Sequence, residues 1–127
     1  MFARYSPDMK KIVYSKIGEN NKTDDVFVMD VTTQKTENLT NTPDELDGWP
    51  MFNKTGDWIY YSAMKNGSRC IFKMKPDGTD VTQITFPTEQ DNEEHARASI
   101  SKDEKTLIFN KKKGKTISIW THNLNPS

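Results

Sequence analysis

Two segments of the sequence concentrate side chains that could bind a ligand, and both are acidic. Residues 41–49 and 87–95 each carry several carboxylates within nine positions. Carboxylate oxygens attract basic peptide segments and are the ligands that Ca²⁺ prefers. The same composition also suits two solvated loops, because clustered charges usually face water. The candidate binding residues are Asp44, Glu45, Asp47, Trp49, Asp91, Glu93, Glu94 and His95.

Catalytic chemistry has little support in the sequence. One histidine beside two carboxylates, as in 93–95, is too common a pattern to indicate acid–base catalysis. Zinc takes three or four ligands, and a ligand nitrogen or sulfur is offered only by His95, His122 and Cys70. No Gly-x-Ser-x-Gly motif and no phosphate-binding glycine loop occurs. We therefore expect no catalytic residue, no metal site and no resident cofactor, with Ca²⁺ as the cation that the acidic segments would suit.

Trp49 is the aromatic residue best suited to contact a partner. It stands where an acidic segment meets an expected strand, and large aromatic side chains dominate the energetics of many interfaces. Most other aromatic residues recur at matching positions of an internal repeat, so we expect them in the core. The lone Cys70 is expected to be a small buried apolar residue.

Charge and hydropathy exclude two classes of partner. Lysine plus arginine number 18, and aspartate plus glutamate also number 18, so no net field draws the chain to nucleic acid. The basic stretch 111–115 has no interleaved aromatic residue for base stacking and is typical of a hairpin tip. No apolar run approaches the roughly 20 residues of a membrane span. We expect neither nucleic-acid binding nor membrane insertion.

An internal repeat organises the whole chain. The segments 3–15, 50–62 and 98–110 each contain an aromatic residue or isoleucine, a polar turn, and a strand with alternating apolar positions. Their second halves also match, because 26–30 resembles 71–75 and, more loosely, 119–123. The first two copies then add a turn and a short closing strand. Four short antiparallel strands in about 47 residues are the pattern of a β-propeller blade.

At the level of motifs, the repeat resembles that of TolB-type propellers. Tyr5-Ser6-Pro7-Asp8, then 26–30 and then Asn38-Leu39-Thr40 follow the family pattern of Pro-x-Trp-Ser-Pro-Asp-Gly-Lys, Ile-Tyr-Val-Met-Asp and Leu-Thr. The second copy keeps Gly56 and Asp77-Gly78, and the third copy diverges most. The resemblance covers essentially the whole chain. It implies an all-β propeller, and it implies a parent protein that works in the periplasm or otherwise outside the cytoplasm.

We predict three blades in one propeller segment, 1–127, with blades at about 2–47, 48–95 and 96–127. The third blade is expected to lack its outer strand, and no signal peptide is recognised in this chain. Three blades do not close a ring of the usual four to eight. We therefore expect half of a six-bladed ring, completed by a second copy in a homodimer or by further sequence of a longer protein.

The function that these patterns favour is non-catalytic binding. The first hypothesis is a propeller scaffold whose acidic channel face engages a protein or peptide. The alternative is a substrate-docking or gating propeller that belongs to a larger hydrolase, either a peptidase or a carbohydrate-active enzyme. A catalytic domain elsewhere in the parent protein would favour the alternative.

Overall fold

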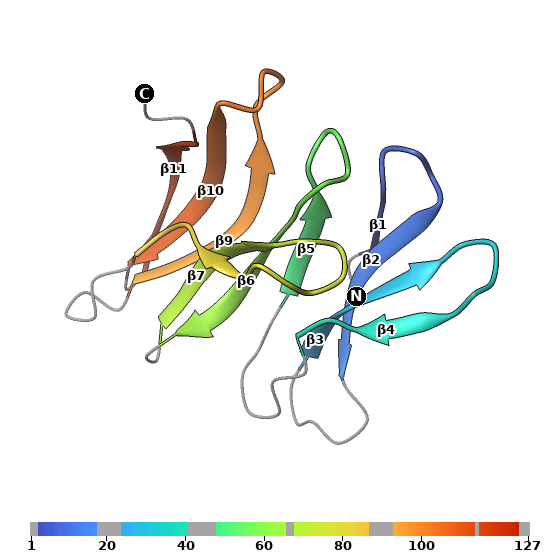
Figure 1. The fold of residues 1–127 in the computed structure, drawn as a ribbon. Helices are drawn as coiled ribbons and strands as arrows, with labels where there is room; N and C mark the ends of the chain where they lie inside the picture. The colour runs from blue at the N-terminus through green and yellow to red at the C-terminus, as the bar shows by residue number, and fades with distance from the viewer. Residues whose placement is uncertain are drawn as a thin grey trace.

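A computed structural model shows three antiparallel β-sheets that fan out side by side (Figure 1). The described residues contain strands and turns and no helix. The predicted all-β propeller architecture is therefore confirmed. The structure describes residues 3–17, 24–40, 48–65, 68–86, 93–113 and 115–124.

The strands follow one another within each sheet in chain order. In the described residues the first two sheets have four strands each, whereas the third has three, as the sequence predicts. The first sheet comprises β1 (Ala3–Tyr5), β2 (Lys11–Ile17), β3 (Asp24–Asp30) and β4 (Thr36–Asn38). The second comprises β5 (Gly48–Phe52), β6 (Ile59–Lys65), β7 (Ser68–Met74) and β8 (Thr82–Gln83). The third comprises β9 (Glu93–Ile100), β10 (Thr106–Lys113) and β11 (Thr116–Asn123).

The first turn of each sheet is built by the same short-range hydrogen bonds. The backbone N–H of Ser6, of Asn53 and of Ser101 donates to the carbonyl oxygen five residues later, at 2.8 Å in each case. The fourth residue of each turn has a left-handed backbone, with φ of 63° at Met9, 82° at Gly56 and 59° at Glu104. Glycine adopts this conformation freely, whereas Met9 and Glu104 adopt it against a steric penalty.

The closing strand is attached to the third strand of its sheet through a threonine. The hydroxyl of Thr40 accepts the backbone N–H of Val26 at 3.1 Å, and the hydroxyl of Thr85 accepts that of Ile71 at 3.0 Å. In both sheets the residue before the threonine donates its N–H to the same third-strand residue, at 2.8 Å. The leucine-threonine or isoleucine-threonine pair of the repeat is therefore a structural clasp.

The core lies between the sheets, in two separate layers. The middle sheet supplies both, because its side chains alternate between its two faces. Ile59 and Tyr61 pack toward the first sheet, whereas Tyr60 and Ile71 pack toward the third. Cys70 is buried in the layer facing the first sheet, as predicted. We call these two layers the first junction and the second junction.

The outer face of the third sheet is open within the described structure. Ile117 and Ile119 of β11 are exposed, and β11 forms one edge of its sheet. The first strands of successive sheets adjoin, since β1 contacts β5 and β5 contacts β9. This is how blades are arranged about a propeller axis. No helix in the described residues has the length and apolarity to cross a bilayer.

Candidate functional site

Four of the predicted binding residues lie outside the described residues. These are Asp44, Glu45, Asp47 and Asp91. The binding of Ca²⁺ or of a basic peptide by these carboxylates stays a prediction. In the described parts of the chain, no group of three or more His, Cys, Asp or Glu side chains is placed to hold a metal ion.

The residues Glu93, Glu94 and His95 belong to a strand, which corrects the prediction that they lie in a loop. They form the start of β9 and pair with Lys113, Lys112 and Lys111 of β10. Strand β9 therefore begins at Glu93, within the segment 87–95 that we expected to be a loop. Charged residues at this end of β9 resemble a loop in the sequence, because they break the apolar alternation that marks a strand.

His95 is packed in the protein interior. Its side chain is 5% exposed, and its ring lies against that of Phe109, with centroids 4.9 Å apart and a tilt of 48°. Phe109 belongs to the second junction. The histidine thus supports the packing of β9 on β10, which differs from the solvent-facing position expected for a loop residue.

Trp49 stands at an irregular point of the inner strand β5. One extra residue lies between the pairs Gly48–Ser62 and Met51–Tyr60, which makes a β-bulge. The tryptophan has a φ of 47°, a left-handed conformation that bulky residues rarely adopt. Bulges turn side chains away from the direction that a regular strand would give them. Strained residues of this kind are found more often at functional sites than elsewhere.

Arg69 of β7 lies against the ring of Trp49. Its guanidinium carbon lies 4.8 Å from the centre of the Trp49 ring, within range of a cation–π contact. The Nε–H of Arg69 is buried and has no hydrogen-bond partner among the described residues. A buried donor without a partner is a position where an acceptor would bind favourably. We call Trp49 and Arg69 the Trp–Arg pair.

The same bulge recurs in the third sheet. One extra residue of β9 lies between the pairs Ala96–Asn110 and Ser99–Ile108. The bulge is therefore shared by the second and third sheets, whereas the Trp–Arg pair belongs to the second blade. The predicted importance of Trp49 had a signal in the sequence, but the bulge and the position of Arg69 did not.

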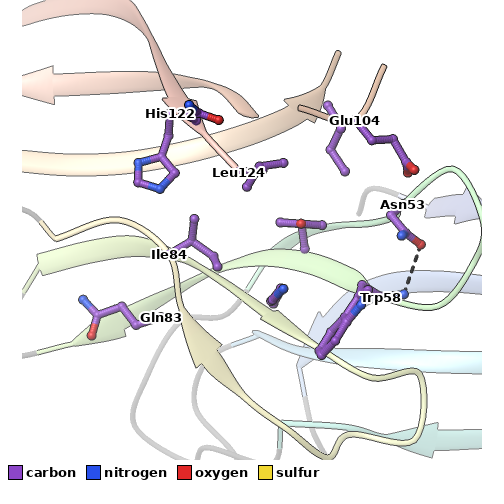
Figure 2. Close-up of a pocket in the computed structure, with 11 residues that line it drawn as sticks. Asn53, Trp58, Gln83, Ile84, Glu104, His122 and Leu124 are labelled. Carbon is purple, nitrogen blue, oxygen red and sulfur yellow. Dashed lines mark hydrogen bonds between the residues drawn. The ribbon is translucent and has the colours of Figure 1, made fainter. Parts of the chain in front are cut away.

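A pocket of about 430 Å³ lies between the second and third sheets (Figure 2). Figure 2 shows His122 and Gln83 toward one end, Asn53 and Glu104 toward the other, and Ile84 and Leu124 between them. This site was not predicted from the sequence. Only His122 offered a signal, because it replaces a methionine of the repeat. The residue is exposed and lines the pocket.

The wall of the pocket carries charged and aromatic groups. The Lys73 ammonium lies 4.2 Å from the centre of the Trp58 ring. Burial raises the pKa of the Tyr60 hydroxyl, and the negative charge of Glu104 raises it further. Glu104 is engaged in the structure, because its Oε1 accepts the backbone N–H of Lys54 at 2.7 Å.

Comparison with known proteins identifies the family. The family model for the TolB β-propeller domain matches residues 2–127. The chain belongs to the TolB β-propeller domain family. Over 81 residues it is 31% identical to an uncharacterized protein of Agrobacterium fabrum, a match that covers 64% of this chain and 27% of that protein.

Solved structures show the same propeller architecture. A protein assigned as TolB from Agrobacterium tumefaciens superimposes with a TM-score of 0.82 at 18% identity, and covers 98% of this TolB-type chain and 46% of its own. For TolB from Acinetobacter baumannii the TM-score is 0.78 at 19% identity, and the match covers 98% of this chain and 30% of that protein. For a puromycin-hydrolyzing peptidase from Mycobacterium tuberculosis the TM-score is 0.73 at 12% identity, and the match covers 96% of this chain and 20% of that protein. The chain thus spans less than half the length of each of these relatives.

Proposed function

We propose that this TolB-type segment is a non-catalytic scaffold that binds a protein or peptide through the Trp–Arg pair and the adjoining acidic segments. The Trp–Arg pair carries the proposal. Tryptophan and arginine are the residues most enriched among those that dominate binding energy at interfaces. The buried Nε–H of Arg69 would donate to a carbonyl or carboxylate oxygen of the partner, while Trp49 would contact an apolar side chain.

The charge of the partner follows from the sequence around the pair. Residues 41–47 and 87–92 are rich in carboxylates and precede the two bulged strands β5 and β9. A partner segment with several lysine or arginine residues and one apolar residue would complement this negative charge and the Trp49 side chain. We therefore favour a basic peptide segment as the ligand.

A fluorescence titration with two synthetic peptides tests this function. One peptide carries lysine and arginine around a central leucine, and the other carries glutamate and aspartate at the same positions. We expect the basic peptide to bind saturably and the acidic one not to bind. Trp49→Ala should weaken binding by about tenfold or more, because each factor of ten corresponds to about 1.4 kcal/mol and an interface tryptophan contributes at least that much.

The control is Trp58→Phe, which alters a tryptophan in the pocket and leaves the Trp–Arg pair intact. It should bind the basic peptide as the unmodified chain does. Equal affinity of Trp49→Ala and the unmodified chain, with the fold verified by circular dichroism, would rule out the Trp–Arg pair as the binding surface.

We also propose that two copies associate head to tail into a six-bladed ring. In support, the open face of the third sheet exposes Ile119, and the opposite end face, on the first sheet, exposes Tyr5. These faces correspond to surfaces that the middle sheet buries against its neighbours. Two copies would also give about the length of the Agrobacterium tumefaciens relative, of which this chain covers 46%. A two-fold axis would make both new contacts identical and close the ring.

Light scattering coupled to gel filtration tests the ring. The unmodified chain should have the mass of a dimer at micromolar concentration, and Ile119→Asp should have the mass of a monomer. Val81→Asp is the matched control, because Val81 is an exposed apolar residue between β7 and β8. A monomeric unmodified chain contradicts the ring and leaves the peptide-binding proposal untouched.

The hydrolase alternative has one observation in its favour, the superposition on the mycobacterial peptidase. At 12% identity this likeness concerns the fold alone.

We place the parent protein outside the cytoplasm because of its family. Alkaline phosphatase fused to the C-terminus of the full-length parent protein should be active if this is right, and an inactive, stable fusion would contradict it.

A further inference from the structure

The two junctions occupy the same place in the repeat but are filled differently. At the first junction, Met74 is completely buried and packs with Leu39 and Phe52. At the second, His122 takes the position of Met74 and Ile100 that of Phe52, and the pocket occupies the space between the sheets. An imidazole is shorter and more polar than a methionine side chain, so it does not fill an apolar gap as methionine does.

The replacements are concentrated around this pocket. Lys73 stands where the first sheet has Val28, and Tyr60 stands where it has Val13. Glu104 takes the place of Gly56 and has the left-handed backbone that glycine adopts without strain. The pocket combines three aliphatic and two aromatic lining residues with several polar ones. A concave site that joins apolar surface to polar groups able to orient a ligand is the kind that binds small molecules.

The polar groups favour an anion over a cation. The Lys73 ammonium lies over Trp58 on the wall and has no carboxylate partner among the described residues. Glu104 accepts the backbone N–H of Lys54, and the Lys54 ammonium donates to the carbonyl oxygen of Lys102 at 3.3 Å. Glu104, the one carboxylate among the described lining residues, is thus already hydrogen-bonded and lies beside a lysine. The positive charge of Lys73 remains available to a ligand.

The apolar part of the wall defines the remainder of the ligand. Ile84 and Leu124 lie between the two polar ends in Figure 2, and Ile100 also lines the pocket. These side chains would cover a flat or branched hydrocarbon body next to the Lys73 ammonium. Water would solvate such a body poorly, so its burial favours binding.

We propose that the pocket at the second junction binds a small organic carboxylate with an apolar body. The carboxylate pairs with the Lys73 ammonium, and the body lies against Ile84, Ile100 and Leu124. His122 lies toward one end of the pocket (Figure 2) and does not fill the space that Met74 fills at the first junction. This site is separate from the Trp–Arg pair and does not depend on peptide binding.

The test uses three probes of matched shape, which are phenylacetate, its neutral amide phenylacetamide, and the cation benzylamine. Titration is followed by the indole N–H resonance of Trp58 in a ¹⁵N-labelled full chain, assigned with Trp58→Phe. We expect phenylacetate to shift this resonance saturably, the amide to bind at least fivefold more weakly, and benzylamine to bind least. Equal affinity for the three probes, or no saturable shift with phenylacetate, overturns the proposal.

The first junction supplies the variants. The double variant His122→Met, Lys73→Val carries the residues of the equivalent positions and should fill the pocket and remove its positive charge. We expect it to bind phenylacetate at least tenfold more weakly while its urea midpoint stays the same or rises. Lys35→Val, which removes an exposed lysine from the turn between β3 and β4, should bind as the unmodified chain does. A stable double variant that retains full affinity contradicts the proposal.

Discussion

Strands β7 and β11 are the same element of the repeat in two different surroundings. Ile71 of β7 is completely buried, whereas Ile119, at the matching position of β11, is 75% exposed. β7 lies in a sheet that has a neighbour on each face, while β11 has one on a single face. The burial of a blade residue therefore depends on the adjacent blade as much as on the repeat itself.

The largest test of this comparison is truncation of the two isoleucines. Ile71→Ala should lower the free energy of unfolding by about 2–5 kcal/mol, because it leaves a cavity in a packed layer. Ile119→Ala should change it by less than about 0.5 kcal/mol in the monomer, as for an exposed surface position. Urea denaturation at low protein concentration measures both. Similar losses for the two variants would contradict the assignment of β11 to an open face.

The clasp of the closing strand gives the next largest effect. Thr85→Val removes the hydroxyl that accepts the Ile71 N–H, and leaves a buried donor without a partner. We expect a loss of about 1–3 kcal/mol. Thr40→Val is the matched variant in the first sheet, where the acceptor is partly exposed, and should lose less. Amide hydrogen exchange at Ile71 should accelerate in the first variant, and unchanged protection there would contradict the role of the clasp.

The turns make stability depend on pH in the first and third sheets. The Ser6 hydroxyl, followed by the backbone N–H of Lys10, holds the pKa of Asp8 below its ordinary value of 3.8. Ser101 and the N–H of Lys105 lower the pKa of Asp103 in the same way. The unfolded chain then binds protons more readily, so this stabilisation is present above the unfolded pKa and is lost as pH falls through the folded one.

Urea midpoints at neutral and acidic pH measure this dependence. Ser6→Ala should reduce the difference between the two midpoints, because the donor that lowers the pKa of Asp8 is removed. Asn53→Ala in the middle sheet is the control, since threonine stands there at the position of the aspartate. An unchanged difference in Ser6→Ala would show that the turn carboxylate contributes nothing.

The smallest effect is expected at the left-handed turn position. Met9→Gly should raise the free energy of unfolding by about 0.5 kcal/mol, because glycine adopts a φ of 63° without the steric penalty of a side chain. The reverse change Gly56→Ala should lower it by about 1 kcal/mol, since its new methyl carbon would also lie 3.4 Å from the Cδ of Pro7. Thermal unfolding of both variants shows whether each change in the free energy of unfolding has the expected sign.

The sequence was sufficient where structure depends on local rules. The turns at Ser6, Asn53 and Ser101 close through hydrogen bonds within five residues, so their sequence pattern predicts them. The apolar pattern that ends the segment 50–62 likewise predicts a strand, and β6 lies there. The limits of the blades, the ring and the acidic site stay predictions.

Features that depend on packing could not be predicted from the sequence. The bulge at Trp49 has no sequence signature, because tryptophan is an unusual residue at a left-handed position. The start of β9 was missed since its first residues are charged. The pocket depends on the packing of two sheets and on the five replacements described above, which become related only when the sheets are stacked.

The open edge at β11 has a consequence for how the purified chain behaves in storage. Residues 116–123 contain no charged residue, no proline and no glycine, and natural edge strands commonly use charges or proline to block pairing with other chains. Short uncharged segments rich in β-branched and aromatic residues are also typical of ordered aggregates. Soluble protein should therefore be lost with time at a rate that rises with concentration, from molecules that are otherwise fully folded. Replacing one residue of this edge strand by lysine is the simplest way to slow the loss of soluble protein.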